Sequence, residues 1–237
     1  MPDKDRPAGR YASPPCMAGE VAPDYFDPMA VDPQQTQDVA RWRKAARARL
    51  LQARADLGVA GRAAVAGALG GHLDALLARR GVALPGRIVA GYWPIRAESD
   101  LRPWMTRLHD AGARLALPVV ETRAAPLVFR PWAPGAAMER GHWNILVPAT
   151  ARTVTPTIVL APLVGWDGAG YRLGYGGGYF DRALAAAGAA RPFAIGVGLQ
   201  GAALPTIYPQ PHDIGLDAIV TEAGVQWEAP ARPIPGS

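Results

Sequence analysis

The sequence predicts a three-layer α/β domain, in which one sheet lies between two layers of helices. Helical patterns alternate with short buried-strand patterns along most of the chain, and no internal repeat or second core is visible. The chain has 237 residues, of which 49% are hydrophobic, which suffices for one sizeable core. We therefore expect a single domain over residues 36–228, an N-terminal extension over 1–35 and a C-terminal tail over 229–237.

The N-terminal extension lacks the periodicity of a folded segment. It is rich in Pro, Asp, Gln and Ala, which predicts a disordered or loosely attached stretch. Its Cys16 is the single cysteine of the chain, so no internal disulfide or Cys-based zinc site can form. No apolar run has the length of a membrane span or a signal peptide. These features predict a cytoplasmic protein with no membrane partner.

The charge balance is basic. The formal net charge is +5 and the sequence pI is about 9.7, which makes nucleic acid one candidate partner. The basic residues, however, are mostly scattered arginines, without the pattern of a zinc finger, a homeodomain or an RNA-recognition motif. We therefore expect small polyanionic ligands rather than nucleic acid.

Two helical patterns open the domain. The first begins at Thr36, a typical N-cap residue, and has apolar residues at three- and four-residue spacing: Val39, Trp42, Ala46, Leu50, Ala53 and Leu57. Most of its basic residues are expected on a solvated face: Arg43, Lys44, Arg47, Arg49 and Arg54. The second helix, from about Gly61 to Arg80, has a packing stripe formed by Val65, Leu69, Leu73, Leu76 and Leu77.

Strand patterns follow. Residues Arg87–Ile95 read as a buried strand that ends at Pro94, and a helix then runs to His109. Two strand-like runs, Arg114–Val120 and Pro126–Trp132, predict a hairpin or sheet edge, and Phe193–Leu199 predicts a further strand. Glu98 and Asp100 lie just before the helix, where Asp100 could serve as its N-cap.

A glycine-rich stretch joins another buried strand, Thr157–Val164, to a helix that begins where the glycines end and continues through Ala183–Ala187. Its glycines permit a close approach of the backbone to a ligand, and the amides of the following helix attract anions. Arg172 and Arg182 add positive charge, and Asp181 could hold Mg²⁺ against phosphate oxygens. The stretch matches neither the P-loop nor the dinucleotide fingerprint. A tight turn needed only for packing is the alternative.

The run RLGYGGGYFDR, residues 172–182, resembles the signature RLGxGxGYYD of the 5-formyltetrahydrofolate cyclo-ligases, also called methenyltetrahydrofolate synthetases. Supporting segments occur in the family's order over about residues 41–222. The resemblance implies a mixed, mainly parallel sheet with the site at the carboxyl ends of its strands. It also implies a ligase that uses ATP and Mg²⁺ to close 5-formyltetrahydrofolate to 5,10-methenyltetrahydrofolate, releasing ADP and phosphate.

The resemblance also implies roles for individual residues. The catalytic residues are Arg172 and Asp181, and the metal ligands are Asp181 and Asp213. ATP is bound by Arg43, Lys44, Arg47, Arg172, Leu173, Gly174, Tyr175, Gly176, Gly177, Gly178, Tyr179 and Phe180. The folate substrate is bound by Trp93, Glu98, Tyr175, Gly176, Gly177, Gly178 and Tyr179. His212 and Asp217 are expected to be structural.

Two departures from the family pattern keep a second function open. Arg43 stands where the family has a lysine, with Lys44 as a possible substitute. Leu146 and Val147 replace a proline and a polar residue, and nearby Trp143 could be a plug in the core. A relative that binds folate or nucleotide without turnover is therefore the alternative to the ligase.

Overall fold

The computed structural model describes residues 33–235, so the extension's Cys16 lies outside the described part. The helices are α1 (Pro33–Asp56), α2 (Gly58–Arg79), α3 (Arg102–Asp110) and α4 (Tyr179–Ala186). The chain divides into two compact units, Met1–Arg41 and Trp42–Ser237, with the boundary inside α1. The described part of the first unit is helical from Pro33, so Thr36 lies within the helix and is not its N-cap.

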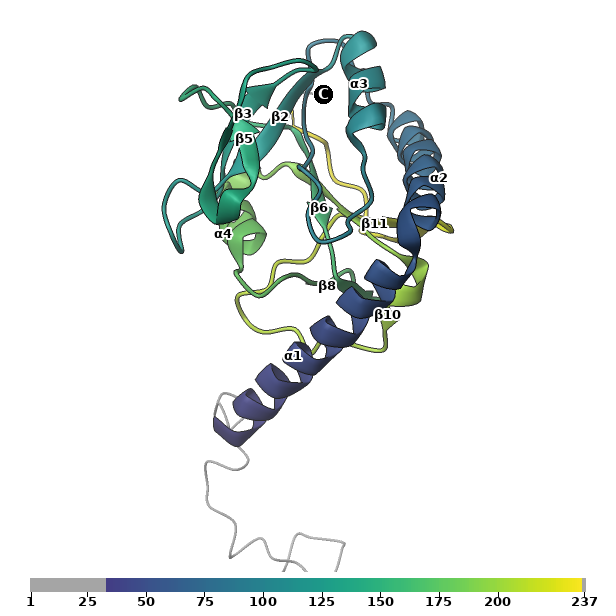
Figure 1. Cartoon of the computed structure of the whole chain (residues 1–237), viewed down its shortest axis with the longest axis vertical. Helices are drawn as coiled ribbons and strands as arrows, with labels where there is room; N and C mark the ends of the chain where they lie inside the picture. The colour runs from purple at the N-terminus through teal and green to yellow at the C-terminus, as the bar shows by residue number, and fades with distance from the viewer. Residues whose placement is uncertain (1–32, 236–237) are drawn as a thin grey trace, which may run out of the picture. The chain divides into compact units, whose positions relative to one another are not determined.

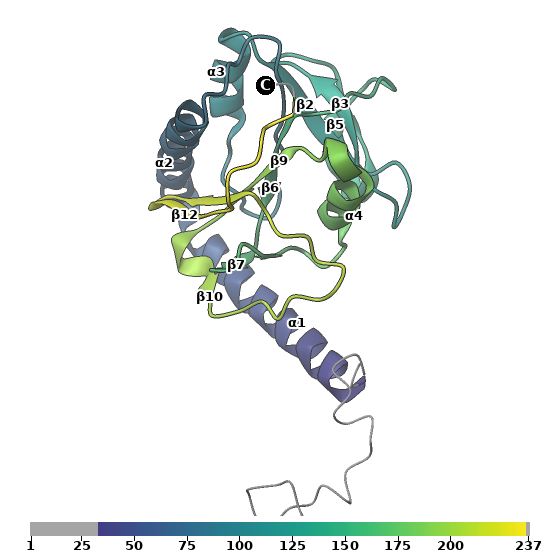
Figure 2. The same ribbon diagram turned by 180° about the vertical axis from the view of Figure 1, so that it is seen from behind.

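A seven-stranded sheet forms the centre of the second unit (Figures 1 and 2). Its order is β12 (Gly224–Glu228), β11 (Ala218–Thr221), β9 (Phe193–Val197), β6 (Ile158–Pro162), β1 (Ile88–Ala90), β2 (Arg114–Val119) and β3 (Val128–Trp132). The five inner strands are parallel, and the two edge strands are antiparallel to their neighbours. The sheet is therefore mixed and mainly parallel, and the predicted hairpin is β2–β3.

Both faces of the sheet are covered by helices. Along β9, Phe193 and Ile195 pack into one hydrophobic cluster with α2 and α3, whereas Ala194 packs into a second cluster with α1 and α4. Successive strand residues point to opposite faces, so two clusters of this kind require two helical layers. Figure 1 shows α2 and α3 on one side of the sheet and α4 on the other. The predicted three-layer α/β/α arrangement is confirmed.

Two small sheets complete the unit. One joins β10 (Ala203–Leu204), β7 (Gly165–Asp167) and β8 (Arg172–Leu173), and the other pairs β4 (Met138–Arg140) with β5 (Leu146–Pro148). Short 3₁₀ turns occur at residues 142–144, 188–190 and 200–202. The β7–β8 ribbon follows the carboxyl end of β6 and leads directly into the glycine-rich loop.

The strand predicted over residues 87–95 is too long. Only Ile88–Ala90 pairs as β1. At Gly91 the chain passes so close to α3 that an added Cβ would lie 2.3 Å from the Met105 sulfur. The Tyr92 hydroxyl then donates to the Ser99 carbonyl at 2.8 Å, which closes the following residues into a loop. This loop carries Glu98 beyond the end of β1.

The expected apolar stripe of α1 is partly wrong. Ala46 and Leu50 are buried as predicted, but Ala53 and Leu57 are exposed. The buried side of the helix instead includes Arg54, because its guanidinium finds carbonyl and hydroxyl acceptors on the domain. Within residues 33–235, no helix is long and apolar enough to cross a membrane.

The described residues of the predicted C-terminal tail are packed against the domain. The Arg232 guanidinium donates to both oxygens of the buried Asp217, at 2.7 Å each, and to the Pro192 carbonyl at 2.6 Å. The Ile234 side chain is buried in the cluster of α2 and α3. A buried carboxylate and an apolar anchor therefore hold the described residues 229–235 against the domain.

Candidate active site

The glycine-rich loop turns directly into α4. Gly176 and Gly178 have φ of 98° and 62°, in the left-handed region that favours glycine, and α4 begins at Tyr179 immediately afterwards. The Arg47 side chain donates from Nε to the Gly174 carbonyl at 2.7 Å. Helix amides and a guanidinium thus meet at one loop, which is the arrangement that binds phosphate.

Arg172 and Asp181 form a buried pair beside this loop. Their closest atoms are 2.9 Å apart, and Arg172 is 6% exposed. The Asp181 carboxylate also accepts the Ile214 amide at 3.1 Å. Burial lowers the pKa of the Arg172 guanidinium, while the charges of Asp181 and Asp213 oppose this shift. Both proposed metal ligands therefore lie near the same arginine.

Arg43 is brought to the second of these carboxylates. Its guanidinium donates to both Asp213 oxygens, at 2.9 and 3.1 Å, and the pair is mostly buried. Asp213 also accepts the Gln210 amide at 2.7 Å. Lys44 is exposed on the same helix. Of the two candidates for the lysine of the family pattern, the structure brings Arg43 and not Lys44 to Asp213.

Glu98 and Tyr175 connect two loops that are far apart in sequence. The Tyr175 hydroxyl donates to Glu98 Oε1 at 2.8 Å, and the Ile95 amide donates to Oε2 at 2.9 Å. Burial raises the pKa of the Glu98 carboxyl, and these two hydrogen bonds together with nearby Arg54 and Arg96 oppose the rise. Glu98 lies outside α3, which begins at Arg102. Its carboxylate points instead toward the glycine-rich loop.

The Glu98 loop contains strained backbone. Arg96 and Ala97 have φ of 45° and 61°, a conformation that is costly for residues other than glycine. Strain of this kind persists where surrounding contacts fix the chain, and it often accompanies ligand sites. Trp93 begins the same loop, and the Arg102 guanidinium lies 4.5 Å from the centre of its indole ring. The loop therefore presents a carboxylate and an aromatic ring.

Aromatic side chains flank the start of α4. The Tyr179 ring lies under the Arg182 guanidinium at 4.7 Å and edge-on to Trp143 at 5.4 Å. Trp143 is 62% exposed and is therefore not a core plug. Val147 is buried within β5. Trp143 therefore contacts the first residue of α4.

Of the two residues expected to be structural, Asp217 has a clear structural role. Asp217 is buried between Arg191 and Arg232 and accepts the Ala194 amide at 2.7 Å. His212 is exposed. Leu173 and Phe180 both contribute apolar contacts, Leu173 as a fully buried residue and Phe180 with its ring 5.7 Å from the Arg172 guanidinium. Among the described residues, no three His, Cys, Asp or Glu side chains gather as a metal cluster.

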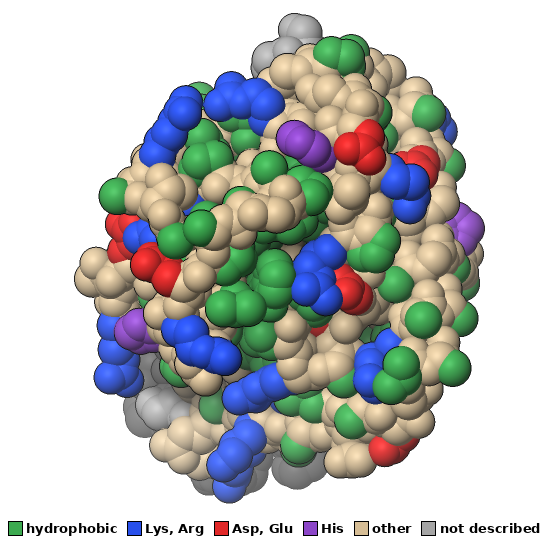
Figure 3. Space-filling model, turned by 45° about the horizontal axis from the view of Figure 1, so that its top comes forward, with side chains coloured by type: hydrophobic (Ala, Val, Ile, Leu, Met, Phe, Trp, Pro, Cys, Tyr) green, Lys and Arg blue, Asp and Glu red, His purple; other side chains and the backbone are tan. Residues whose placement is uncertain are grey.

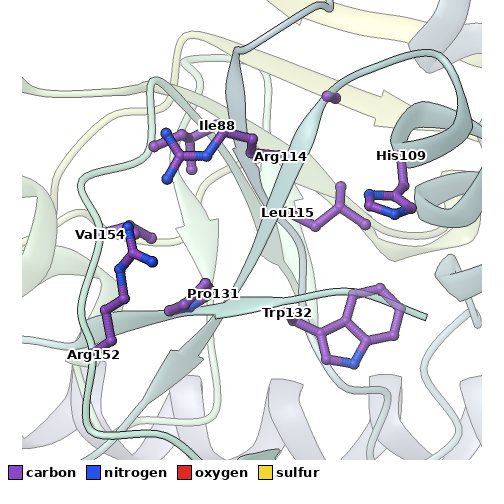
Figure 4. A pocket seen from close by; sticks show the side chains of 9 residues that line it. Ile88, His109, Arg114, Leu115, Pro131, Trp132, Arg152 and Val154 are labelled. Atoms are coloured by element: carbon purple, nitrogen blue, oxygen red, sulfur yellow. The ribbon is translucent and has the colours of Figure 1, made fainter. Parts of the chain in front are cut away.

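The described residues line two cavities. One, of about 220 Å³, is found at the amino ends of β1 and β2, with Arg114 and Arg152 on one side and His109 and Trp132 on the other (Figure 4). The other, of about 270 Å³, lies between α4 and β3 and includes Phe180 in its wall. Figure 3 shows a face with hydrophobic side chains in a hollow and Lys and Arg side chains around it.

Arg54 is the residue of this region that sequence reasoning missed. It is 7% exposed and donates to the Tyr175 hydroxyl and to the Arg96 carbonyl, the latter at 3.0 Å. The sequence gives one indication that Arg54 belongs to this region, which is its position in the helix. Arg43, Arg47 and Arg54 are separated by four and seven residues, which places all three on one side of a helix.

Known proteins resemble this chain over the same region. The 5-formyltetrahydrofolate cyclo-ligase family model matches residues 39–222. The 5-formyltetrahydrofolate cyclo-ligase of Mycolicibacterium smegmatis is 33% identical over 74% of this chain and 91% of its own length. The corresponding Escherichia coli K12 protein is 31% identical over 59% of this chain and 80% of its own.

Solved structures give the same result. The 5,10-methenyltetrahydrofolate synthetase of Aquifex aeolicus superposes with a TM-score of 0.66 at 26% identity, covering 81% of this chain and 95% of that one. A synthetase from Mycoplasma pneumoniae has the same fold, with a TM-score of 0.60 at 23% identity over 76% and 98% of the two chains. The family model and the sequence relatives together show that this chain belongs to the 5-formyltetrahydrofolate cyclo-ligase family.

Proposed function

We propose that this protein converts 5-formyltetrahydrofolate to 5,10-methenyltetrahydrofolate with ATP, releasing ADP and phosphate. One observation carries the proposal beyond family membership. Tyr175, inside the glycine-rich loop, donates to Glu98 on the loop after β1. A phosphate-binding loop and a carboxylate suited to a pterin therefore share a hydrogen bond, so the two substrates can be held side by side.

The phosphate end of the site is formed by the glycine-rich loop and three arginines. Arg47 already donates to the Gly174 carbonyl, and Arg43 and Arg172 are each paired with an aspartate. We infer that ATP phosphates take over these guanidinium contacts, since a planar fork of donors matches phosphate oxygens. Burial and nearby Arg43 lower the pKa of the Arg47 guanidinium. A bound polyanion therefore stabilises the charged form of this side chain.

When ATP phosphates take over the guanidinium contacts, the two aspartates become available to bind Mg²⁺. Asp181 and Asp213 offer oxygen atoms near one arginine, and Mg²⁺ commonly binds one or two carboxylates together with substrate phosphates and water. The donor set therefore fits, and we assign Asp181 and Asp213 as the residues that would hold the ion. When bound, it supplies neutralisation of the charge that develops on the transferred phosphoryl group.

The pterin end is formed by Glu98, with Trp93 and Tyr179 as apolar walls. One carboxylate can accept the adjacent N–H groups of a pterin together. Both Glu98 oxygens already accept a hydrogen bond from the protein, which fixes the plane of the carboxylate before the substrate arrives. Each ionised oxygen keeps a further lone pair for the ligand.

The reaction proceeds without a covalent enzyme intermediate. The formyl oxygen of the substrate attacks the γ-phosphorus of ATP, and ADP leaves. N10 then attacks the activated formyl carbon and releases its proton, and phosphate departs with the former formyl oxygen. Arg172 and the amides at the start of α4 orient the phosphoryl group, so the protein contributes positioning and charge stabilisation. We propose a cytoplasmic location, and the single cysteine agrees with a reducing compartment.

The test is the absorbance of the conjugated methenyl product, recorded with purified protein, 5-formyltetrahydrofolate, ATP and Mg²⁺. We expect product and ADP to form together, and neither to form without ATP. Folate binding by calorimetry without ATP-dependent product would contradict the ligase and identify the non-catalytic relative. Binding to nucleic acid that weakens steeply with salt and ignores folate would favour a basic nucleic-acid-binding protein instead.

A further inference from the structure

Arg54 lies where three separate segments of the site meet. Its guanidinium donates to the Leu163 carbonyl after β6 at 3.4 Å, to the Arg96 carbonyl after β1 at 3.0 Å, and to the Tyr175 hydroxyl after β8. Among residues 33–235 it forms hydrogen bonds but no ion pair, and its Nε has no acceptor. Burying a guanidinium without a carboxylate partner is unfavourable for stability, which indicates a purpose at the site.

The direction of the hydrogen bonds follows from the chemistry of arginine. A guanidinium has donors and no acceptor, so the Tyr175 oxygen must accept from Arg54. The Tyr175 hydrogen is then directed to Glu98 Oε1, and the Ile95 amide donates to Oε2. Both Glu98 oxygens are acceptors in this chain of bonds, which is the arrangement of the ionised carboxylate.

We propose that Arg54 is a positioning residue of the folate site, which holds Tyr175 and the Glu98 loop so that the Glu98 carboxylate is ionised and correctly oriented before substrate binds. The inference rests on the proposed function, since it assigns how that site recognises the pterin. Arg54 itself is buried behind Tyr175 and acts through the tyrosine and the loop.

The strained loop gives independent support. Arg96 and Ala97 both have left-handed φ, and the Arg96 carbonyl is the group that Arg54 holds. The Arg54 and Arg96 guanidiniums lie 5.6 and 5.4 Å from the centre of the Tyr175 ring. Loss of Arg54 removes a contact that keeps this conformation and one of the two cations beside the ring.

Four titratable or charged groups face Glu98. Arg54 and Arg96 stabilise its ionised form, and Tyr175 donates a hydrogen bond to it. Burial raises the pKa of Tyr92 well above its ordinary value, and the charge of Glu98 contributes, so this phenol stays neutral. Removing Arg54 therefore raises the pKa of Glu98 further. Folate binding requires the ionised carboxylate. As the pH falls, the variant therefore loses folate binding at a higher pH than the wild type does.

The experiment measures the Kd of 5-formyltetrahydrofolate by calorimetry without ATP, from about pH 5 to about pH 9. Arg54→Met is compared with Arg49→Met, which removes an exposed arginine from the same helix. For Arg54→Met we expect the loss of binding to move to higher pH by about one unit or more. Arg49→Met should overlay the wild type. Arg54→Lys keeps the charge but not the fork, so its curve should lie between the two.

A purely structural Arg54 gives a different result. Its loss would lower the melting temperature while the Kd–pH curve kept its wild-type midpoint, and that outcome overturns the inference. If Arg54→Met does not fold, the test uses Arg54→Lys instead. A Kd–pH curve that is not shifted in that variant also overturns the inference. A wild type that binds no folate at any pH overturns the proposed function itself, which is a separate and recognisable failure.

Discussion

The Glu98 carboxylate combines deep burial with two donors from the protein. Glu98→Gln keeps the size but places a donor where the pterin also donates. We expect the KM for folate to rise by about one to two orders of magnitude, which corresponds to about 1.5–3 kcal/mol for a charge-assisted hydrogen bond. The KM for ATP should stay near the wild-type value. Equal losses for both substrates would show that Glu98 has a general structural role.

A substitution of Asp181 distinguishes a role in phosphoryl transfer from a role in stabilising helix α4. It lies in the first turn of α4, where a carboxylate also stabilises the helix. Asp181→Ala should lower kcat by about 100-fold or more and leave folate binding nearly intact, because the lost group acts on the phosphates. Steady-state kinetics and folate calorimetry on the same preparation test this. A variant that loses only about 1 kcal/mol of stability and turns over normally would assign Asp181 to the helix alone.

The junction of the glycine-rich loop and α4 is tested by two matched substitutions. Gly178 at the start of the helix and Gly188 beyond its end both have left-handed φ, 62° and 51°. An alanine at either position should cost about 1–2 kcal/mol of stability. Only Gly178→Ala should also raise the KM for ATP, because only Gly178 presents the helix amides to the ligand. A similar KM for ATP in both variants would remove the loop from the nucleotide site.

Helix α1 shows what periodicity predicts and what it misses. The three- and four-residue spacing correctly predicted a helix and the burial of Ala46 and Leu50. The same rule placed Arg54 in solvent, because charged residues are normally found there. The acceptors that allow its burial come from Leu163, Arg96 and Tyr175, all distant in sequence. The spacing of Arg43, Arg47 and Arg54 places them on one side of the helix, but the local sequence does not indicate which distant groups accept their hydrogen bonds.

The C-terminal segment acts on the stability of the whole domain. Arg232 is one of two arginines that hold the buried Asp217. Arg232→Met should cost about 1–3 kcal/mol, because a buried carboxylate loses hydrogen-bond donors. For a domain of this size that lowers the Tm by about 2–12 °C. Neither KM should change, and Arg152→Met, at an exposed arginine, should leave the Tm unaltered. A Tm unchanged in Arg232→Met would mean that the segment does not anchor the domain.

The whole fold was easier to predict than the contacts of the site. Alternating helical and strand patterns were enough for the three layers, because each pattern states which face is buried. The glycine-rich stretch was predicted together with the start of its helix for the same local reason. The pairings of Arg43 with Asp213 and of Tyr175 with Glu98 bring together distant segments, which only the folded chain reveals.

The central claim is that the substrate's formyl oxygen is phosphorylated by ATP within this site. Substrate labelled with ¹⁸O in the formyl group, combined with unlabelled ATP and water, tests it directly. We expect the inorganic phosphate released with the methenyl product to carry the label when analysed by mass spectrometry. Phosphate without the label, formed alongside the methenyl product, would show that the oxygen leaves by another route and would contradict the account.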